Sequence, residues 1–379
     1  MKYGKVLLLG AYGQTNLGDD LLLYNYLKFL HEKGFKEIEV NASEAKYIPK
    51  SITEAFDNMK VFETYNTSPL ALIKRLMQAD CVVYGGGTVY KELYATTGRS
   101  RYAVIVNVAL FNIMARIMGK PVYGCHLGIG SIKTGFGRFM SRMALLASTH
   151  TTFRDEKSFT YARDVLKLPA KKISHSTDGL FINEEWKKPW NTLAIERPKN
   201  AKRVVGVNVL HDIPDWVDRK KYIKDMVSFL DRLMKQGDYL VFMPFQTDFN
   251  KHNDLVFLQK EILPKLKGRA YHVSDDLTLD NIISGLQQID ILVGMRLHSL
   301  ELAATAGTPF VALAYDTKCV RYAQEIDHPY VLKLEEFTED ALYNMYSQAL
   351  KDDTVKPRLQ KVTNSNYKIA GAWLKSLDF

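Results

Sequence analysis

The residue types best suited to chemistry follow an apolar run in the segment Asp290–Pro309. The run ends at Gly294, and Arg296 and His298 come next, two residues apart. A helix of small residues is expected from about Ser299, and a helix N-terminus offers N–H groups and the positive end of a dipole to an anion. This spacing predicts a site for a small anion, with a histidine placed to transfer a proton.

Two further cations follow predicted strands. Lys318 comes after the strand Phe310–Ala314, and adjacent parallel strands would bring it beside Arg296. Arg154 follows the strand His150–Phe153, where an arginine can grip a carboxylate or a phosphate with two hydrogen bonds. The alternative for Arg154 is an ordinary surface pair with an aspartate, which contributes little to stability.

Three consecutive glycines come directly after the apolar strand Cys81–Tyr84. Glycine allows positive φ and close approach of a ligand to the backbone. The N–H groups of Gly86 and Gly87, with the hydroxyl of Thr88, predict an anion-binding nest. A tight turn without a ligand is the alternative.

The first loop after a strand carries Asn16 and Asp19. Asp19 is expected to cap a helix over Asp20–His31. In this class of fold a capping position also faces the ligand, so Asn16 and Asp19 are predicted to bind sugar hydroxyls as well. The loop lacks the GxGxxG spacing and therefore does not favour a dinucleotide site.

Two more residues are candidates with competing structural roles. His126 lies just after a strand among several glycines, and it is predicted to bind substrate, although a lone histidine more often packs inside a protein. Glu301 lies one helical turn beyond His298. It is predicted either to accept a proton from a hydroxyl or to orient the imidazole.

The elements that position these residues alternate between short apolar strands and longer amphipathic helices, which is typical of parallel α/β structure. Strands are predicted at Lys5–Leu9, Ile38–Asn41, Cys81–Tyr84, Pro121–Gly124, His150–Phe153, Arg203–Val209, Tyr239–Met243, Ala270–His272, Ile289–Val293, Phe310–Ala314 and Tyr330–Leu332. Helices are predicted at Asp20–His31, Pro69–Gln78, Tyr102–Met118, Lys221–Gln236, Leu255–Leu266, Leu277–Gln287, Ser299–Ala306, Glu339–Leu350 and Asn364–Leu377.

This pattern predicts two facing Rossmann-like domains with parallel sheets and a cleft between them, where ligands bind beyond the carboxyl ends of the strands. The N-terminal domain is expected to span residues 1–183, and a polar linker with two prolines residues 184–202. The C-terminal domain is expected over residues 203–338, and residues 339–379 as helices that pack back across the interface.

Composition and charge exclude several classes of protein. The chain has 379 residues, 46% of them apolar and 25% charged, which is ordinary for a globular protein of two domains. Its three cysteines are scattered and predict neither a disulfide framework nor a zinc site. The short N-terminal apolar run predicts a buried strand and no signal peptide, and no run of residues is long enough to cross a membrane. The net charge of +9 favours anionic partners, but no nucleic-acid motif accompanies it.

Five motifs in order, NLGDD, YGGGT, FRDEKS, GMRLHS and YDTK, are similar to those of the polysaccharide pyruvyl transferases. The resemblance covers about residue 10 to about residue 320, and the segment MRLHS followed by TPFVALAYDTK is its most specific part. It implies a GT-B-like fold, with an acceptor side in the N-terminal domain and a donor side in the C-terminal domain. It also implies an enzyme that moves the enolpyruvyl group of phosphoenolpyruvate onto two hydroxyls of one sugar, which forms a pyruvate ketal and releases phosphate.

For the site, the resemblance implies that Arg154, Arg296, His298 and Lys318 bind and activate the donor. Gly86, Gly87, Thr88, Asn16, Asp19, His126 and Glu301 complete the expected substrate contacts. The segment around His126 follows the family pattern only loosely. No metal and no cofactor are expected.

The expected partners are phosphoenolpyruvate and a sugar of a cell-surface polysaccharide or its lipid-linked precursor. The enzyme is expected in the cytoplasm. Peripheral contact with an anionic membrane surface and formation of a homo-oligomer are both left open. Two other functions stay open: a GT-B glycosyltransferase that uses a sugar nucleotide, and a carbohydrate-binding module without catalysis. The module would be expected to lack the cationic cluster, and the glycosyltransferase to carry an acidic residue for a ribose after GMRLHS.

Overall fold

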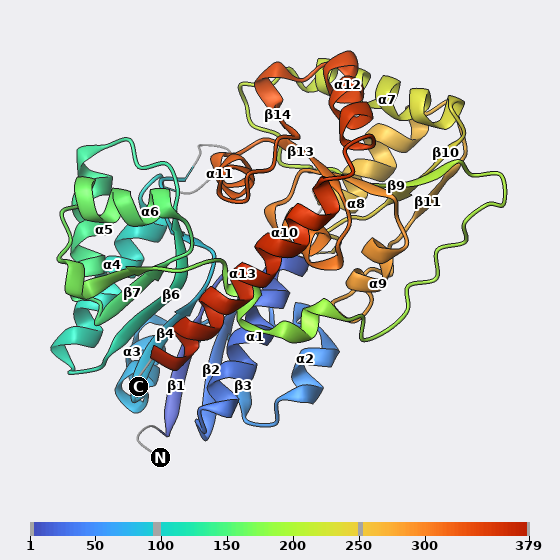
Figure 1. The fold of residues 1–379 in the computed structure, drawn as a ribbon. Helices are drawn as coiled ribbons and strands as arrows, with labels where there is room; N and C mark the ends of the chain where they lie inside the picture. The colour runs from blue at the N-terminus through green and yellow to red at the C-terminus, as the bar shows by residue number, and fades with distance from the viewer. Residues whose placement is uncertain (1–3, 94–99, 249–252, 377–379) are drawn as a thin grey trace. The chain divides into compact units, whose positions relative to one another are not determined.

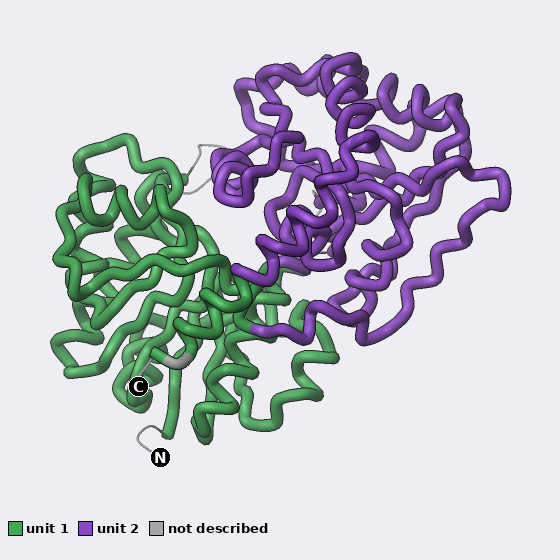
Figure 2. Tube along the Cα trace, viewed as in Figure 1, with its two compact units in different colours: residues 1–14, 19–182, 366–379 green, residues 15–18, 183–365 purple. Residues whose placement is uncertain are grey.

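The computed structural model describes residues 4–93, 100–248 and 253–376. It divides into two compact units, each built on a parallel sheet (Figure 1). Unit 1 comprises residues 1–14, 19–182 and 366–379, and unit 2 comprises residues 15–18 and 183–365 (Figure 2). The predicted class of two α/β units with parallel sheets is confirmed. The predicted linker, and the packing of the last helices across an interface, stay predictions.

Unit 1 contains an eight-stranded parallel sheet with the order β3-β2-β1-β4-β6-β7-β8, in which β5 pairs with β6. The strands are β1 Lys5–Leu9, β2 Glu37–Ala42, β3 Met59–Glu63, β4 Cys81–Gly85, β5 Thr88–Tyr90, β6 Val122–Ile129, β7 His150–Phe153 and β8 Ile173–His175. The helices are α1 Leu17–Glu32, α2 Lys50–Ala55, α3 Pro69–Gln78, α4 Ala103–Ile117, α5 Gly135–Ala147 and α6 Glu156–Thr160, which continues into a π turn at Tyr161–Val165. Short 3-10 turns lie at Ala45–Tyr47, Ala170–Lys172 and Gly179–Ile182.

The central strands of the unit 1 sheet are buried on both faces, which explains the apolar runs Val6–Leu8 in β1 and Cys81–Tyr84 in β4. On one face, Leu7 of β1 and Val82 of β4 pack in a cluster with Leu76 of α3, Ile105 of α4 and Leu145 of α5. Helices α3, α4 and α5 therefore form one layer against this sheet.

Unit 2 contains a six-stranded parallel sheet with the order β11-β10-β9-β12-β13-β14. The strands are β9 Arg203–Asn208, β10 Asp238–Phe242, β11 Tyr271–Val273, β12 Ile291–Gly294, β13 Phe310–Ala314 and β14 Val331–Lys333. The helices are α7 Arg219–Lys235, α8 Asp254–Phe257, α9 Ile282–Gln287, α10 Leu297–Ala306, α11 Thr317–Glu325 and α12 Glu339–Ala349. Helix α13, Val355–Ser376, begins in unit 2 and ends in unit 1. Further short turns lie at Glu184–Lys187, Leu258–Ile262, Leu263–Lys265 and Leu334–Glu336.

The strand register of unit 2 aligns the ends of β9 and β12, and β13 ends two residues further on. Gly294 of β12 lies opposite Asn208 of β9 and Ala312 of β13. The loops that follow these strands consequently leave the sheet at one edge, which is where ligands bind in open α/β sheets.

The predicted start of the first helix was wrong. The helix expected from Asp20 begins at Leu17, so Asp19 lies inside its first turn and does not cap it. Instead the side chain of Asn16 accepts a hydrogen bond from the N–H of Gly18 at 3.2 Å. Asp19 and Asp20 both lie in the first turn of α1, where a carboxylate interacts favourably with the positive end of the helix dipole.

Among the described residues, none of the helices is both long enough and apolar enough to span a bilayer.

Candidate active site

Arg296 is held in place by a buried carboxylate in unit 2. It follows β12, and its backbone N–H donates to Asn208 Oδ1 at 3.1 Å. Its guanidinium donates through Nε to Asp254 Oδ2 at 2.5 Å and through Nη2 to Asp254 Oδ1 at 2.8 Å. Nη2 also donates to Gln246 Oε1 at 3.1 Å. Four hydrogen bonds thus fix both the backbone and the head group of Arg296.

The charge of Arg296 is balanced by Asp254, which is fully buried. Burial alone would raise the pKa of Asp254, but the nearby Arg296 and the hydrogen bond from His211 lower it overall. His211 Nδ1 lies 3.0 Å from Asp254 Oδ1, and its backbone N–H donates to the same oxygen at 3.1 Å. Asp254 is therefore an anion that positions Arg296. Because Asp254 balances its charge, Arg296 offers a ligand oriented N–H donors and little net positive charge.

The loop of Asn16 lies against the same group in unit 2. Asn16 forms an antiparallel bridge with Gln246, and the N–H of Leu17 donates to the carbonyl of Phe245 at 2.9 Å. Since Gln246 also accepts from Arg296, the segment NLGDD and the segment GMRLHS meet through one glutamine. Asn16 and Arg296 thus both contact Gln246, while their predicted roles in binding a ligand stay predictions.

His298 lies on α10 with its imidazole packed against Gly18. A Cβ atom at Gly18 would approach His298 Nδ1 to 1.8 Å, so no residue larger than glycine fits there without displacing the ring. His298 Nε2 lies 3.9 Å from Glu301 Oε2, and the Glu301 side chain is almost completely buried. The imidazole is thereby confined by Gly18 on its Nδ1 side and lies near a buried carboxylate on its Nε2 side.

Lys318 lies in the first turn of α11, beyond β13. Its Nζ lies 5.3 Å from the centroid of the Tyr315 ring. Burial raises the pKa of Tyr315, while Lys318 and Arg296 both act to lower it. The two cations therefore act on one phenol. Burial lowers the pKa of Lys318, but Tyr315 and Cys319 raise it more, so Lys318 is protonated at neutral pH.

In unit 1, Arg154 is buried and paired with a buried aspartate. Its Nη1 donates to Asp178 Oδ2 at 2.8 Å, and its Nη2 donates to Thr88 Oγ1 at 3.2 Å. A Cβ atom at Gly128 would lie 3.1 Å from both Arg154 Nε and Thr88 Oγ1, so this glycine makes room for the pair. The alternative of an exposed surface pair is wrong, because both partners are almost inaccessible to solvent. That Arg154 binds the same ligand as Arg296 and Lys318 stays a prediction.

The glycine turn after β4 matches the expectation in conformation and departs from it in hydrogen bonding. Gly86 and Gly87 have φ values of 74° and 78°, which few other residues tolerate. The N–H of Gly86, however, donates to the carbonyl of Cys125 at 2.9 Å and belongs to the sheet. A Cβ atom at Gly87 would meet nothing within 4 Å, so the open part of the turn is at Gly87, beside Thr88.

His126 is enclosed inside unit 1. Its Nδ1 lies 2.7 Å from the hydroxyl of Tyr26, and its ring centroid lies 4.0 Å from that of Trp373. Burial lowers the pKa of His126 to about 3, so the ring is neutral. These contacts give His126 a packing role, and a substrate could reach it only by displacing neighbouring side chains.

The two acidic residues after Gly18 differ in environment. Asp19 is partly exposed, whereas Asp20 is buried, and its Oδ1 has no hydrogen-bond partner among the described residues. Burial, together with the neighbouring Asp19, raises the pKa of Asp20 well above its usual range. Asp19 thus stays the carboxylate suited to face a ligand, and Asp20 carries a proton at higher pH than an ordinary aspartate.

Four residues that organise the unit 2 site were not predicted from the sequence. They are Asn208, His211, Gln246 and Asp254. Asn208 ends β9 and Gln246 follows β10. Because polar residues at strand ends are candidates for a site, both could have been found from the sequence. Asp254 offered no such signal, because it begins a helix and becomes buried only through the fold.

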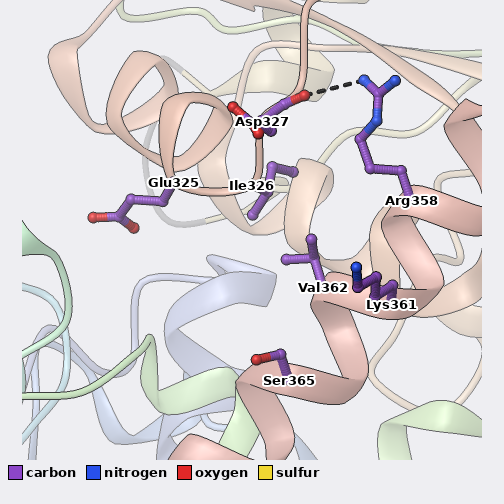
Figure 3. Close-up of a pocket in the computed structure, with 7 residues that line it drawn as sticks. All are labelled: Glu325, Ile326, Asp327, Arg358, Lys361, Val362 and Ser365. Carbon is purple, nitrogen blue, oxygen red and sulfur yellow. Dashed lines mark hydrogen bonds between the residues drawn. The ribbon is translucent and has the colours of Figure 1, made fainter.

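A hollow of about 570 Å³ elsewhere in unit 2 contains none of the predicted site residues (Figure 3). It lies between the end of α11 and the first half of α13 and is lined by Glu325, Ile326, Asp327, Arg358, Lys361, Val362 and Ser365. Arg358 Nη1 donates to the carbonyl of Asp327 at 3.0 Å across it (Figure 3). The hollow is separate from the group around Arg296 and His298.

Comparisons with known proteins bear on both family and fold. A sequence model of the polysaccharide pyruvyl transferase family matches residues 16–317. The matched segment ends one residue before Lys318. No curated protein sequence matches the chain.

Several solved structures are similar over nearly the whole chain. The UDP-GlcNAc 2-epimerase from Methanocaldococcus jannaschii has a TM-score of 0.63 at 11% identity and covers 98% of both chains. The UDP-GlcNAc 2-epimerase from Neisseria meningitidis, bound to UDP-GlcNAc, has a TM-score of 0.60 at 13% identity and covers 98% of this chain and 97% of its own. A glycosyltransferase from Rickettsia africae has a TM-score of 0.61 at 13% identity, over 98% and 96%. These similarities confirm the predicted GT-B-like fold.

Proposed function

The chain belongs to the polysaccharide pyruvyl transferase family, and on that premise we propose that it transfers the enolpyruvyl group of phosphoenolpyruvate to a sugar. Two hydroxyls of one sugar unit take part. The product is a cyclic pyruvate ketal, and phosphate is released.

The observation that carries this proposal is the position of Arg296 and Lys318 directly after the neighbouring parallel strands β12 and β13. Phosphoenolpyruvate carries a carboxylate and a phosphate on a three-carbon frame, so its binding needs cationic donors that are close together. In the proposed complex Lys318 supplies net positive charge. Arg296, neutralised by Asp254, supplies directed N–H groups, which distinguish a planar carboxylate from other anions.

His298 is proposed as the acid that protonates the methylene carbon of the donor. Protonation makes the central carbon electrophilic, and one sugar hydroxyl adds to it. A second hydroxyl of the same sugar then replaces phosphate at that carbon. Of the two hydroxyl protons released, one balances the proton gained by the methyl group and the other leaves with phosphate. General acid catalysis of this kind contributes about 10²- to 10⁴-fold to a rate.

Glu301 and Asp19 are the proposed partners in proton transfer. Glu301 lies 3.9 Å from His298 Nε2 and is suited to hold the imidazole in one orientation. Asp19, partly exposed in the first turn of α1, is suited to accept a proton from a sugar hydroxyl. The reaction as proposed draws on no metal ion and no organic cofactor, since the cations of the chain supply the charge.

The proposed acceptor is a sugar of a cell-surface polysaccharide or of its lipid-linked precursor. One structure similar in fold is described as bound to UDP-GlcNAc, which makes a sugar carried on a diphosphate a reasonable acceptor to test. Phosphoenolpyruvate is a cytoplasmic metabolite, so we propose that the reaction takes place in the cytoplasm.

The experiment that tests the function is incubation of the protein with phosphoenolpyruvate and a panel of sugar acceptors. The panel contains free disaccharides, UDP-GlcNAc and lipid-linked saccharides, and the products are weighed by mass spectrometry. A product with the mass of the acceptor plus pyruvate minus water supports the proposal. Transfer of the sugar from UDP-GlcNAc to another acceptor, without use of phosphoenolpyruvate, would instead support a GT-B glycosyltransferase.

A further inference from the structure

Helix α4 of unit 1 is strongly apolar, although one side of it faces solvent. Its sequence AVIVNVALFNIMARI contains two asparagines, Asn107 and Asn112, and one charged residue, Arg116. Large apolar side chains that gather on the solvent side of a helix often mark a contact surface. Here Ile105 and Ala109 pack in the core, while Leu110 and Ile117 are 57% and 81% exposed.

Helix α5, which packs beside α4, extends this exposed apolar surface (Figure 1). Phe136 and Phe139 of α5 are 49% and 57% exposed. The ring of Phe136 meets that of Tyr102, just before α4, with centroids 4.9 Å apart in an edge-to-face arrangement. The exposed apolar side chains of the two helices therefore belong to one layer of unit 1.

The chain around these helices is strongly basic. From Leu93 to Phe153 it has seven lysines and arginines and neither aspartate nor glutamate. The rest of the chain has 44 basic and 42 acidic residues, so this stretch supplies most of the net charge of +9. Lys133, before α5, and Arg138, within it, are both exposed.

The acidic residues at either end of the basic stretch do not offset this charge at the surface. Glu92, which precedes it, is buried and accepts hydrogen bonds from the N–H and the hydroxyl of Thr134 at 2.9 and 2.6 Å. Asp155, which follows it, is buried and caps α6 by accepting from the N–H of Ser158.

We propose that this surface, formed by Leu110, Ile117, Phe136 and Phe139 with the flanking Lys133 and Arg138, docks onto a phospholipid bilayer with anionic headgroups. We call it the α4–α5 face. Apolar side chains beside lysines and arginines are the combination that holds a helix in the plane of a membrane interface. Helix α4 has 15 residues, fewer than the roughly 20 that a membrane-spanning helix needs, so contact at the interface is the geometry that fits it.

This inference goes beyond the proposed reaction and is carried by the α4–α5 face alone. It is compatible with a lipid-linked acceptor, because docking would hold the enzyme at the surface where such an acceptor resides. A soluble acceptor would leave the argument for docking unchanged.

The test is sedimentation of the full chain with vesicles in the absence of substrate. Vesicles of phosphatidylcholine alone are compared with vesicles that contain phosphatidylglycerol, at low and at high salt. We expect binding to the anionic vesicles that weakens with salt, and at least about tenfold weaker binding to phosphatidylcholine alone.

Two variants separate the apolar and the electrostatic contributions. Leu110→Gln with Phe139→Gln is expected to weaken binding to anionic vesicles by at least about tenfold, because the inserted side chains lose their apolar character. Lys133→Glu with Arg138→Glu is expected to remove the preference for anionic vesicles. The matched controls are Trp216→Gln, at a 55% exposed aromatic residue of unit 2, and Lys351→Glu, at an exposed lysine, and neither should change binding.

Three outcomes would overturn the proposal. The first is that the wild-type chain binds neither kind of vesicle, and the second is that the Leu110→Gln, Phe139→Gln variant binds as well as wild type. The third is that the wild-type chain binds no vesicles and forms a dimer in light scattering, which this variant converts to monomers. The last would assign the α4–α5 face to a second copy of the chain. Transfer to a water-soluble acceptor should be unaffected by all of these variants, so failure of docking and failure of the proposed reaction are distinguishable.

Discussion

At the scale of single residues, the site in unit 2 depends on how Asp254, Gly18 and Glu301 hold the two groups proposed to react with the donor. Asp254 fixes the guanidinium of Arg296 with two hydrogen bonds, and Gly18 leaves room for the ring of His298. Arg296, His298 and Glu301 came from the motif itself, but Asp254 and Gly18 lie far away from it in the sequence. Their roles follow from packing, which residue types and spacing do not encode.

His298 is the residue whose loss should affect chemistry most and binding least. We expect His298→Ala to abolish turnover, while the affinity for phosphoenolpyruvate stays within about tenfold, because an acid acts mainly in the transition state. Phosphate release at steady state measures the first quantity, and calorimetric titration with the donor measures the second. A variant that keeps nearly the full kcat would contradict the assignment.

Gly18 tests the same role without altering the imidazole. A Cβ atom in Gly18→Ala would overlap His298 Nδ1, so the ring must turn away, and we expect kcat to fall by about 10²-fold or more. Gly371→Ala is the matched control, because a Cβ atom there meets nothing within 4 Å and alanine favours the helix. Wild-type kcat in Gly18→Ala would show that the position of the ring is unimportant.

Arg296 should affect donor binding and folding together. Arg296→Ala leaves Asp254 buried without its main cation, and breaking a buried pair in this way costs about 3–5 kcal/mol. Arg296→Lys keeps a positive charge but loses the paired geometry, so we expect a smaller loss of stability and a clear rise in the Kd of the donor. Thermal unfolding and donor titration of both variants measure the two effects. Equal donor affinity in wild type and Arg296→Lys would count against a directed role for the guanidinium.

At the scale of elements, the sequence pattern was sufficient for most strands and insufficient for several helix boundaries. Strands β1 and β13 have the predicted bounds, because their buried apolar residues give a continuous signal. Strand β7 also has the predicted bounds, although its sequence HTTF is mostly polar. Helix α5 was not predicted, since its first turn contains Gly135 and Gly137, which favour a loop. Its start is fixed by Thr134, whose hydroxyl accepts from the N–H of Gly137 at 3.0 Å.

The last helix shows how tertiary contacts decide a boundary. Helix α13 was expected from Asn364 and begins at Val355. Its final turns belong to unit 1, where Trp373 Nε1 donates to Thr152 Oγ1 at 2.7 Å and the indole meets His126. The role of Trp373 depends on partners more than 200 positions away, which no local pattern reveals.

Trp373 should accordingly stabilise the strands that it covers. We expect Trp373→Phe to lower the stability of unit 1 by about 1–3 kcal/mol, because the buried hydroxyl of Thr152 loses a donor. Faster amide hydrogen exchange in β6 and β7 would report the loss. Ile369→Ser, at a half-exposed position of the same helix, is the control and should leave exchange in these strands unchanged. Unchanged exchange in Trp373→Phe would contradict the role given to the indole.

At the scale of the whole molecule, each unit contains a buried neutral histidine that makes the fold sensitive to acid. Burial lowers the pKa of His126 to about 3 and that of His328 to about 4. In the unfolded chain both groups titrate near 6.5, so between that pH and 4 the unfolded state binds protons that the folded state does not. The contribution of these two histidines to stability is therefore fully present above about pH 6.5 and is lost as the pH is lowered, by up to about 1.4 kcal/mol per pH unit for each histidine.

This acid sensitivity is measurable by urea unfolding at pH 7 and pH 5. His328→Gln keeps a donor for the carbonyl of Phe310, the present partner of His328 Nε2, but no longer titrates. We expect the variant to lose less stability than wild type between the two pH values. Equal losses would show that His328 is not the group responsible.

The most direct test of the account is the reaction run in D₂O with phosphoenolpyruvate and a sugar acceptor, followed by mass spectrometry of the sugar. We expect a sugar that gains one pyruvate ketal, whose methyl group carries deuterium from solvent, with one phosphate released for each ketal formed. A ketal without deuterium would contradict protonation of the methylene carbon by an acid in exchange with solvent. An unmodified sugar across the acceptor panel, with no phosphate released, would contradict pyruvyl transfer itself.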